Sequence, residues 1–255
     1  MVTPTPVRSG FRVAGQDAPS TVYAHPPLVE SWLGVDFVTP VDLASADLQA
    51  LRVQLGPEWL DRWKQVESGS VRQITNVMGD RALQLTAQGF AFGWLGYGGE
   101  RYPRYETIRD GFVSVFGAVQ SMGTKADQPR VPQSWSVYYL NRIPQGTVWS
   151  TAGDWSFFSL WQPVPLQGLG IEPSGFSAEW NLPLEAERGD LKIQFEHRLT
   201  DDTENVWINL KASGPVEDAE TGVFDGLDYG REVIVRSFNE LVSPDAKKYW
   251  GGQLR

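Results

Sequence analysis

The strongest constraint on the fold is a change of phase in one apolar pattern. Large apolar side chains occupy odd positions from Leu83 to Leu85 but even positions from Phe90 to Trp94. Because strand side chains alternate between two faces, one regular strand cannot move its apolar set from odd to even positions. The pattern predicts either a tight hairpin that ends on a left-handed Gly89 or a bulge at Gly89 in one long strand, and we favour the hairpin.

A Gly-rich turn and a helix are expected after these strands. Pro103 suits the first position of a helix, where its missing N–H needs no partner, and Glu106 falls in the first turn, where the helix dipole favours an anion. The apolar stripe that follows has helical spacing and consists of Tyr105, Ile108, Phe112, Val115, Phe116 and Val119. The sequence therefore predicts a helix over Pro103–Val119 that packs its aromatic side on a sheet.

The second half of the chain has a similar outline. A strand is expected over 135–143, and alternating segments at 176–182, 191–199 and 206–211 with short polar turns indicate an antiparallel meander. A second helix is expected over Leu227–Val242. We predict an α+β protein whose antiparallel sheet is packed by two main helices, with an arrangement in two similar β-rich halves left open.

Composition divides the chain into three parts. Residues 1–24 are rich in Pro, Ser, Gly and Thr and show no periodicity, which predicts a flexible N-terminal arm. Residues 122–134 contain two prolines, a glycine and several polar residues, so they mark a boundary. We place an N-terminal α+β half at 25–121 and a C-terminal α+β half, a four-stranded meander with a helix, at 134–255.

Five short segments carry a resemblance to a known family. They are Pro26-Pro27-Leu28-Val29-Glu30, Leu83 to Trp94, Tyr102 to Glu106, Tyr139-Leu140-Asn141 and Trp250-Gly251. With these segments the chain resembles a sporadically distributed, uncharacterised prokaryotic family, although Gly93 stands where an Asn is common. The resemblance implies a link to mobile or defence-associated genes, and it implies no catalytic residue.

Charge and composition exclude several classes of protein. The chain has 31 acidic and 22 basic residues, a net charge of −9, so the basic surface typical of a nucleic-acid binder is not expected. It has no cysteine, which excludes disulfides, thiolate catalysis and Cys-ligated metals. No apolar signal region and no run of transmembrane length occur, so we expect a cytoplasmic protein that does not bind membranes.

Reactive groups are few. The two histidines, His25 and His197, have no motif partner, and no pattern of metal ligands, nucleophile or cofactor-binding loop is present. Glu179 and Glu196 lie on the polar sides of neighbouring predicted strands beside Trp180, the arrangement that a carboxylate-based hydrolase would need. We predict no catalytic residue, no metal and no cofactor, and keep the hydrolase as a third hypothesis.

An excess of aromatic residues is the most informative positive feature. The candidate binding residues are Trp149, Trp155, Phe157, Phe158, Trp161 and Trp180. Core packing explains most aromatic residues, but this cluster lies beside a segment rich in Pro and Gly, which favours an exposed aromatic surface. The first hypothesis is therefore a non-catalytic binding or regulatory protein that engages a polypeptide partner. The alternative is a small-ligand pocket between the sheet and the C-terminal helix.

Overall fold

The computed structural model describes residues 21–41, 45–59, 66–68, 71–99, 101–121, 129–151, 156–159, 175–200, 202–218 and 222–254. The strands in these ranges are β1 (Thr21–Tyr23), β2 (Leu28–Phe37), β3 (Val66–Ser68), β4 (Val71–Thr75), β5 (Arg81–Leu85), β6 (Gly89–Leu95), β7 (Pro132–Pro144), β8 (Ser177–Pro183), β9 (Asp190–Thr200), β10 (Thr203–Pro215) and β11 (Gly252–Leu254). The helices are α1 (Ser45–Leu55), α2 (Tyr105–Ser121), α3 (Gly222–Leu241) and α4 (Pro244–Tyr249), with short 3₁₀ turns at Pro57–Trp59 and Glu185–Glu187.

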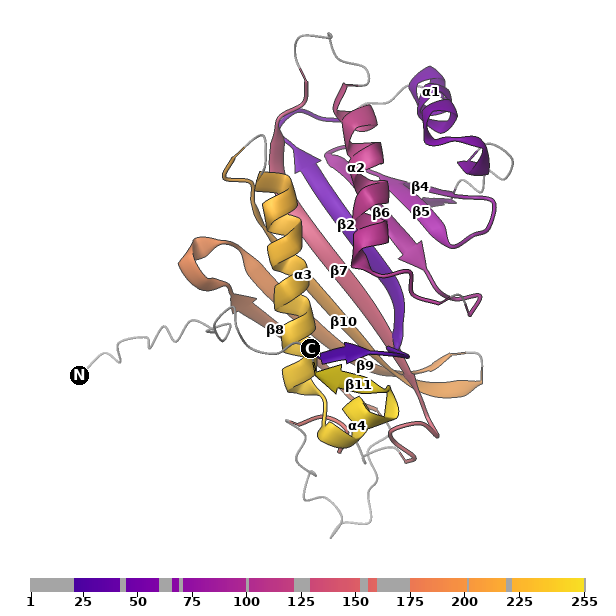
Figure 1. Ribbon diagram of the computed structural model, residues 1–255, viewed down its shortest axis with the longest axis vertical. Coiled ribbons are helices and arrows are strands. Elements are labelled where there is room, and N and C mark those ends of the chain that lie inside the picture. Colours follow the sequence, from indigo (N-terminus) through magenta and orange to yellow (C-terminus); the bar gives the residue numbers. More distant parts are fainter. Residues whose placement is uncertain are drawn as a thin grey trace, which may run out of the picture.

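One large antiparallel sheet connects both halves of the chain. Among the described residues it has nine strands in the order β3-β4-β5-β6-β2-β7-β10-β9-β8, and β1 pairs with β11 in a separate two-stranded sheet. Helices α1, α2 and α3 all cover one face of the large sheet (Figure 1). The predicted fold class, α+β with antiparallel sheet packed by two main helices, is confirmed.

The two halves have the same strand order. In the first half β2 pairs with β6, the last strand of the meander β4-β5-β6, and α2 follows. In the second half β7 pairs with β10, the last strand of the meander β8-β9-β10, and α3 follows. The leading strands β2 and β7 pair with each other antiparallel at the centre of the sheet, with Leu33 opposite Val137. The two predicted halves are therefore joined in one continuous sheet.

The phase change between β5 and β6 is a hairpin, and the alternative of one bulged strand is wrong. Leu85 pairs with Phe90, and the N–H of Thr86 donates to the carbonyl of Gly89. Gly89 does not have the left-handed conformation that we expected. Glycine is required here because the backbone of β2 lies very close. An added Cβ would lie 1.9 Å from the carbonyl oxygen of Val35 in β2.

The structure corrects the start of both main helices. Helix α2 begins at Tyr105, so Pro103 precedes the helix and is not its first residue. The residue between them, Arg104, has a left-handed backbone with φ of 82°. This conformation interrupts the helical path and costs a non-glycine residue about 1 kcal/mol or more. Helix α3 begins at Gly222, five residues before the predicted start.

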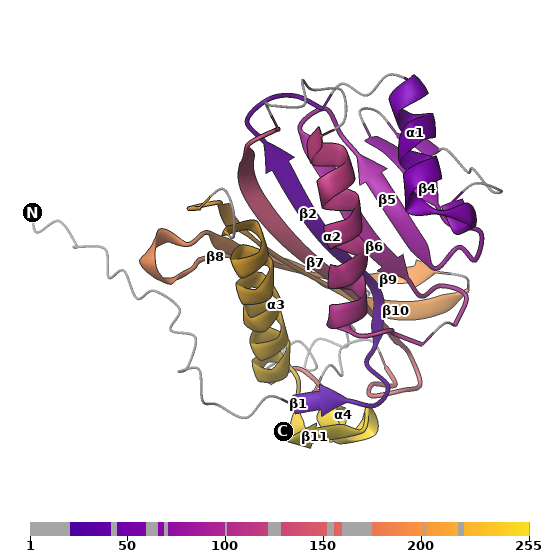
Figure 2. The same ribbon diagram turned by 45° about the horizontal axis from the view of Figure 1, so that its top comes forward.

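The C-terminal end of the predicted N-terminal arm belongs to the folded structure. Residues 21–23 form β1, which pairs with β11 beside the end of α3 (Figure 2), whereas residues 1–20 lie outside the described residues. Tyr23 is buried because its ring packs edge-on against Phe238 and Trp250, and its hydroxyl donates to Asn239. These three contacts give this segment a fixed place that its composition did not indicate.

The helices of the described residues include none that is both long and apolar enough to cross a membrane.

Candidate functional site

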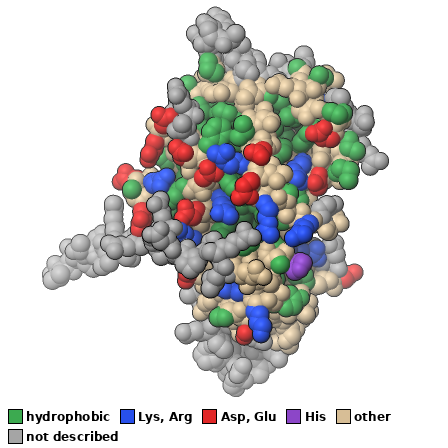
Figure 3. Space-filling view, viewed as in Figure 1, with side chains coloured by type: hydrophobic (Ala, Val, Ile, Leu, Met, Phe, Trp, Pro, Cys, Tyr) green, Lys and Arg blue, Asp and Glu red, His purple; other side chains and the backbone are tan. Residues whose placement is uncertain are grey.

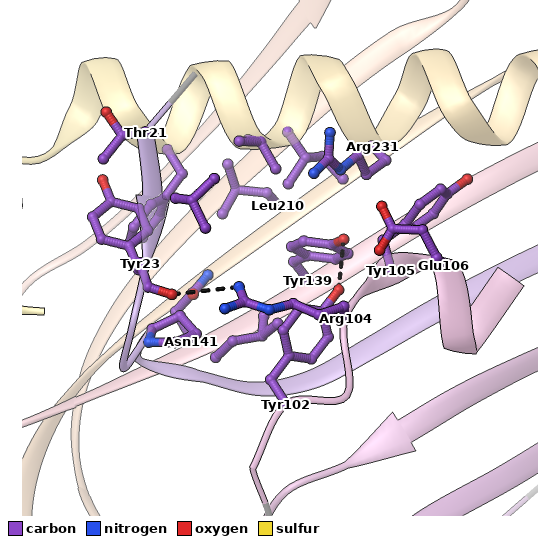
Figure 4. A pocket seen from close by; sticks show the side chains of 16 residues that line it. Thr21, Tyr23, Tyr102, Arg104, Tyr105, Glu106, Tyr139, Asn141, Leu210 and Arg231 are labelled. Carbon is purple, nitrogen blue, oxygen red and sulfur yellow. Dashed lines mark hydrogen bonds between the residues drawn. The ribbon is translucent and has the colours of Figure 1, made fainter. Parts of the chain in front are cut away.

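A pocket of about 360 Å³ lies between the sheet and helix α3. The sheet forms its floor with β7 and β10, α3 lies over it, and the segment 102–106 at the start of α2 closes one side (Figure 4). Strand β1 and the start of β2 close the opposite side. Its volume lies at the lower end of the range for small-molecule sites, 300–1,000 Å³.

Most of the lining is apolar. Leu28 comes from β2, Leu210 from β10, and α3 contributes Ile234, Val235 and Phe238, which lie on one side of the helix. Ile234 and Leu210 have no exposed surface, and Leu28 and Phe238 are buried, whereas Val235 is partly exposed. A ligand in this space would lose its water shell against alkyl and aromatic carbon, which is the main favourable contribution to binding an apolar group.

Tyrosine hydroxyl groups supply hydrogen-bonding groups to the pocket. The hydroxyl oxygens of Tyr102 and Tyr139 lie 3.1 Å apart, so one hydroxyl donates to the other and the second keeps its proton for another acceptor (Figure 4). At the other end, Tyr23 donates its hydroxyl proton to Asn239. The pocket therefore combines tyrosine hydroxyl groups with an apolar wall formed by α3 and β10.

Arg231 is the unusual residue of the pocket. Its Nε is buried and has no hydrogen-bond partner, and its guanidinium carbon lies 5.7 Å from the centre of the Tyr105 ring. No ion pair of Arg231 occurs in the described part of the chain. Arg231 is half-buried and its side chain also hydrogen-bonds Tyr139, but a buried N–H without an acceptor is costly, so an anion that accepts from Nε would stabilise this group.

The carboxylate one turn before Arg231 on α3, Asp228, is already engaged. Asp228 accepts hydrogen bonds from Arg109 Nε at 2.9 Å and from Arg109 Nη2 at 3.1 Å, and from the Tyr105 hydroxyl at 2.6 Å. This network connects α2 to α3, and charged side chains of both signs gather over these two helices (Figure 3). Asp228 therefore serves the helix–helix contact and is not free to pair with Arg231.

Two further charged residues line the pocket. Arg104 donates from Nη1 to the backbone carbonyl of Tyr23 at 3.4 Å, and Glu106 lies in the first turn of α2 (Figure 4). With Arg231 the lining has two positive groups and one negative group, a net charge of +1 within a protein of net charge −9. The strained backbone of Arg104 lies at this site, and such strain is concentrated at functional positions in proteins.

The pocket tyrosines are expected to remain protonated. Burial raises the pKa of Tyr23, Tyr102, Tyr105 and Tyr139 above the usual value near 10. At Tyr139 the neighbouring Arg231 guanidinium opposes part of this rise. These hydroxyls are therefore hydrogen-bond donors at neutral pH and not phenolate bases, so they suit binding better than proton abstraction.

The predicted aromatic surface is largely interior. Trp149, Phe157 and Phe158 are buried, with 3%, 2% and 7% of their surface exposed, and of the described four only Trp180 is exposed, at 37%. The Trp149 indole donates to the carbonyl of Ile143, and Phe158 packs edge-on against Phe195 in β9.

The physical reason is that residues 156–159 pack against the end of α3. Ser243 donates its N–H to the carbonyl of Phe157, and Ser159 donates to the carbonyl of Leu241. Trp155 and Trp161 lie outside the described residues. A polypeptide partner stays a prediction, but the three buried side chains belong to the core and expose little surface.

The two carboxylates of the hydrolase hypothesis each lie beside a cation. Glu179 in β8 forms an ion pair with Lys192 at 3.0 Å, and Glu196 in β9 lies 3.5 Å from Arg198. Hydrogen bonds from Lys192 and its neighbours lower the pKa of the Glu179 carboxyl. A general acid needs a raised pKa, so this site does not favour a glycosidase.

Neither histidine lines the pocket. The buried His197 side chain is 3.5 Å from Glu204 and packs edge-on against Trp149, as expected for an imidazole held in the interior. In the described ranges no group of three or more His, Asp and Glu side chains is placed to hold a metal ion.

Comparison with known proteins adds no assignment: no protein-family model matches the chain, and no curated protein is significantly similar to it.

The segments that carry the sequence resemblance nevertheless meet around the pocket. Residues 26–28, 102–106 and 139–141 contribute directly to the lining. Trp94 packs against Tyr102 and Trp250 packs against Tyr23, so the remaining two segments support lining residues from behind. Parts of all five segments therefore lie at the pocket or directly behind its lining.

Sequence reasoning missed Arg231, although a signal for it was present. Leu227, Arg231, Ile234 and Phe238 are spaced by four, three and four residues, so they lie on one side of a helix. A charged residue within an apolar stripe indicates a buried charge. This spacing predicts that Arg231 is partly buried, but its position over a cavity depends on the long-range pairing of β7 with β10.

Proposed function

We propose that this protein binds a small, largely apolar molecule in the pocket between the sheet and α3. The observation that supports the proposal is the pocket itself, which has an apolar wall formed by Leu210, Ile234 and Phe238 and a small number of polar side chains. Small-molecule sites in proteins have this composition. The protonated tyrosines and the lack of a favourable acid–base pair at Glu179 support binding without catalysis.

A neutral solvatochromic dye tests the proposal. Nile red is expected to bind with a blue-shifted emission, and to bind at least tenfold more weakly to Val235→Phe. Val235 is partly exposed and lines the pocket, so the larger ring extends into the free volume without overpacking a closed core.

Val113→Phe is the matched control. Val113 lies on α2 with 41% of its surface exposed and does not line the pocket, so this variant should bind the dye like the wild type. Equal loss of binding in both variants, or no dye binding to the wild type, would refute the proposal.

A further inference from the structure

The charges of the pocket restrict the chemistry of the ligand, an inference that rests on the proposed function. Arg231 provides a positive group with a buried, unpartnered Nε. The two carboxylates that flank it on α3 are engaged elsewhere, Asp228 by Arg109 and Tyr105 and Glu232 by Arg236. A neutral ligand without an acceptor would leave Arg231 Nε unpartnered, and a cation would be repelled by the guanidinium. An anion that reaches this group would pair with it and supply the missing acceptor.

The number of positive groups sets the charge of the anion. Arg231 and Arg104 line the pocket, but Glu106 lines it as well, which leaves a net charge of +1. A dianion such as a phosphate monoester would carry one negative charge in excess of the lining. A monoanionic carboxylate matches the net charge, and its two oxygens match the planar donor fork of one arginine.

The positions of the polar and apolar residues set the direction of the ligand. Arg231, Tyr139 and Tyr105 lie together at one end of the pocket, whereas Thr21 and Tyr23 lie at the other end with Leu210 between them (Figure 4). From Arg231 to Phe238, α3 advances seven residues, or about 10 Å at 1.5 Å per residue. The lining is therefore long enough for an extended alkyl chain and ends in a single cationic group.

We propose that the pocket takes an amphipathic monocarboxylic acid, with its carboxylate at Arg231 and its apolar chain along α3 toward β1. The hydroxyl of the Tyr102–Tyr139 pair that keeps its proton is a second donor to the carboxylate. The start of α2, where the helix dipole favours an anion, lies at the same end of the pocket.

A series of three ligands with one chain length tests this proposal. Octanoate, octan-1-ol and octylammonium are titrated separately into the wild-type protein in a calorimeter. Octanoate is expected to bind about tenfold or more tightly than the alcohol, since a hydrogen bond to a charged group is worth this factor, and octylammonium is expected to bind most weakly.

Arg231→Gln is expected to remove the preference for octanoate and to leave the affinity for octanol within about threefold. Lys248→Gln is the charge-matched control, because Lys248 is exposed on α4 and does not line the pocket, and it should keep the full preference. Arg231→Lys retains the charge without the planar fork and should bind octanoate with intermediate affinity. Circular dichroism verifies that each variant is folded. The comparison of the three ligands on the wild-type protein does not depend on the folding of any variant.

The possible results separate the two proposals. Octanol binding as tightly as octanoate would refute the carboxylate and leave the small-ligand pocket intact. A preference for octanoate that survives Arg231→Gln would refute the role of Arg231. Binding of none of the three ligands would refute both the carboxylate and the proposed function.

Discussion

Replacing Arg231 with methionine should stabilise the protein in the absence of ligand. The substitution removes a positive group whose Nε is buried without a partner. Methionine is unbranched and flexible, so it retains the apolar stem of arginine in contact with the sheet. The expected result is a gain in the free energy of unfolding and a loss of affinity for carboxylates, because the group that suits an anion is unfavourable when no anion is present.

The magnitude follows from two opposing contributions. A buried donor without a partner costs about 1–3 kcal/mol. The contact of the guanidinium with the Tyr105 ring, at 5.7 Å, contributes about 0.5–1 kcal/mol that the variant loses. The net gain is about 1 kcal/mol, which corresponds to a rise in Tm of about 2–4 °C for a chain of this size.

Thermal unfolding followed by circular dichroism measures the effect, with Arg109→Met as the control. Arg109 lies on α2 and donates two hydrogen bonds to Asp228, so its loss should lower the free energy of unfolding by about 1 kcal/mol, a value reduced by solvent exposure. A Tm for Arg231→Met that is 2 °C or more below the wild type would show that Arg231 is stabilised in the free protein. The reasoning about the pocket would then be wrong.

Three further predictions concern the fold. Gly89→Ala should lower the free energy of unfolding by about 3 kcal/mol or more in urea titrations, because the new Cβ would clash with Val35. Gly79→Ala should lower it by only about 1 kcal/mol, because Gly79 has open space around it and a φ of 78°. Equal losses would contradict this. Tyr23→Phe should cost about 1–2 kcal/mol, because it removes the hydrogen bond to the buried Asn239, and an unchanged urea midpoint would contradict it. Burial raises the pKa of the pocket tyrosines, so above pH 10 the folded state holds protons that the unfolded chain releases. The contribution of these tyrosines to the free energy of unfolding should therefore be constant below pH 10. Above pH 10 it should fall by more than about 1.4 kcal/mol per pH unit. Tyrosine absorbance that titrates normally near pH 10 in the folded protein would contradict this.

Local patterns predicted most of the fold. The hairpin between β5 and β6 follows from the phase of its apolar residues. The conformation of Gly89 did not follow, because its constraint comes from the carbonyl of Val35 on a distant strand. Rules for turns describe backbone dihedral angles, whereas this glycine is required by tertiary contact.

The candidate site was harder to predict than the fold. The cluster from Trp149 to Trp161 had the composition of a binding surface, yet the described residues of this cluster are buried against α3 and β9. Sequence composition does not distinguish aromatic residues on an exposed surface from aromatic residues of an irregular segment that packs into the core. The pocket could not be recognised from composition either, because its lining residues come from distant segments between Thr21 and Phe238. No local sequence pattern contains them together.

Comparison of the two halves indicates that the topology alone does not produce the pocket. Both halves place a helix over the same arrangement of strands, but under α2 the space is filled by phenylalanines: Phe90 stacks on Phe112 at 5.1 Å, and Phe37 stacks on Phe116 at 6.2 Å.

The N-terminal part of helix α3 lies very close to the sheet. A Cβ at Gly226 would lie 2.2 Å from Trp135, and one at Gly230 would lie 2.6 Å from the same ring. The next residue, Arg231, begins the part of α3 that covers the pocket, with Ile234 and Phe238 farther along. Two glycines therefore bring one end of the helix against the sheet, and larger residues on the following turns line the space that remains. Because the corresponding space under α2 is filled by aromatic rings, we attribute the pocket to the side chains of α3 and not to the shared strand order.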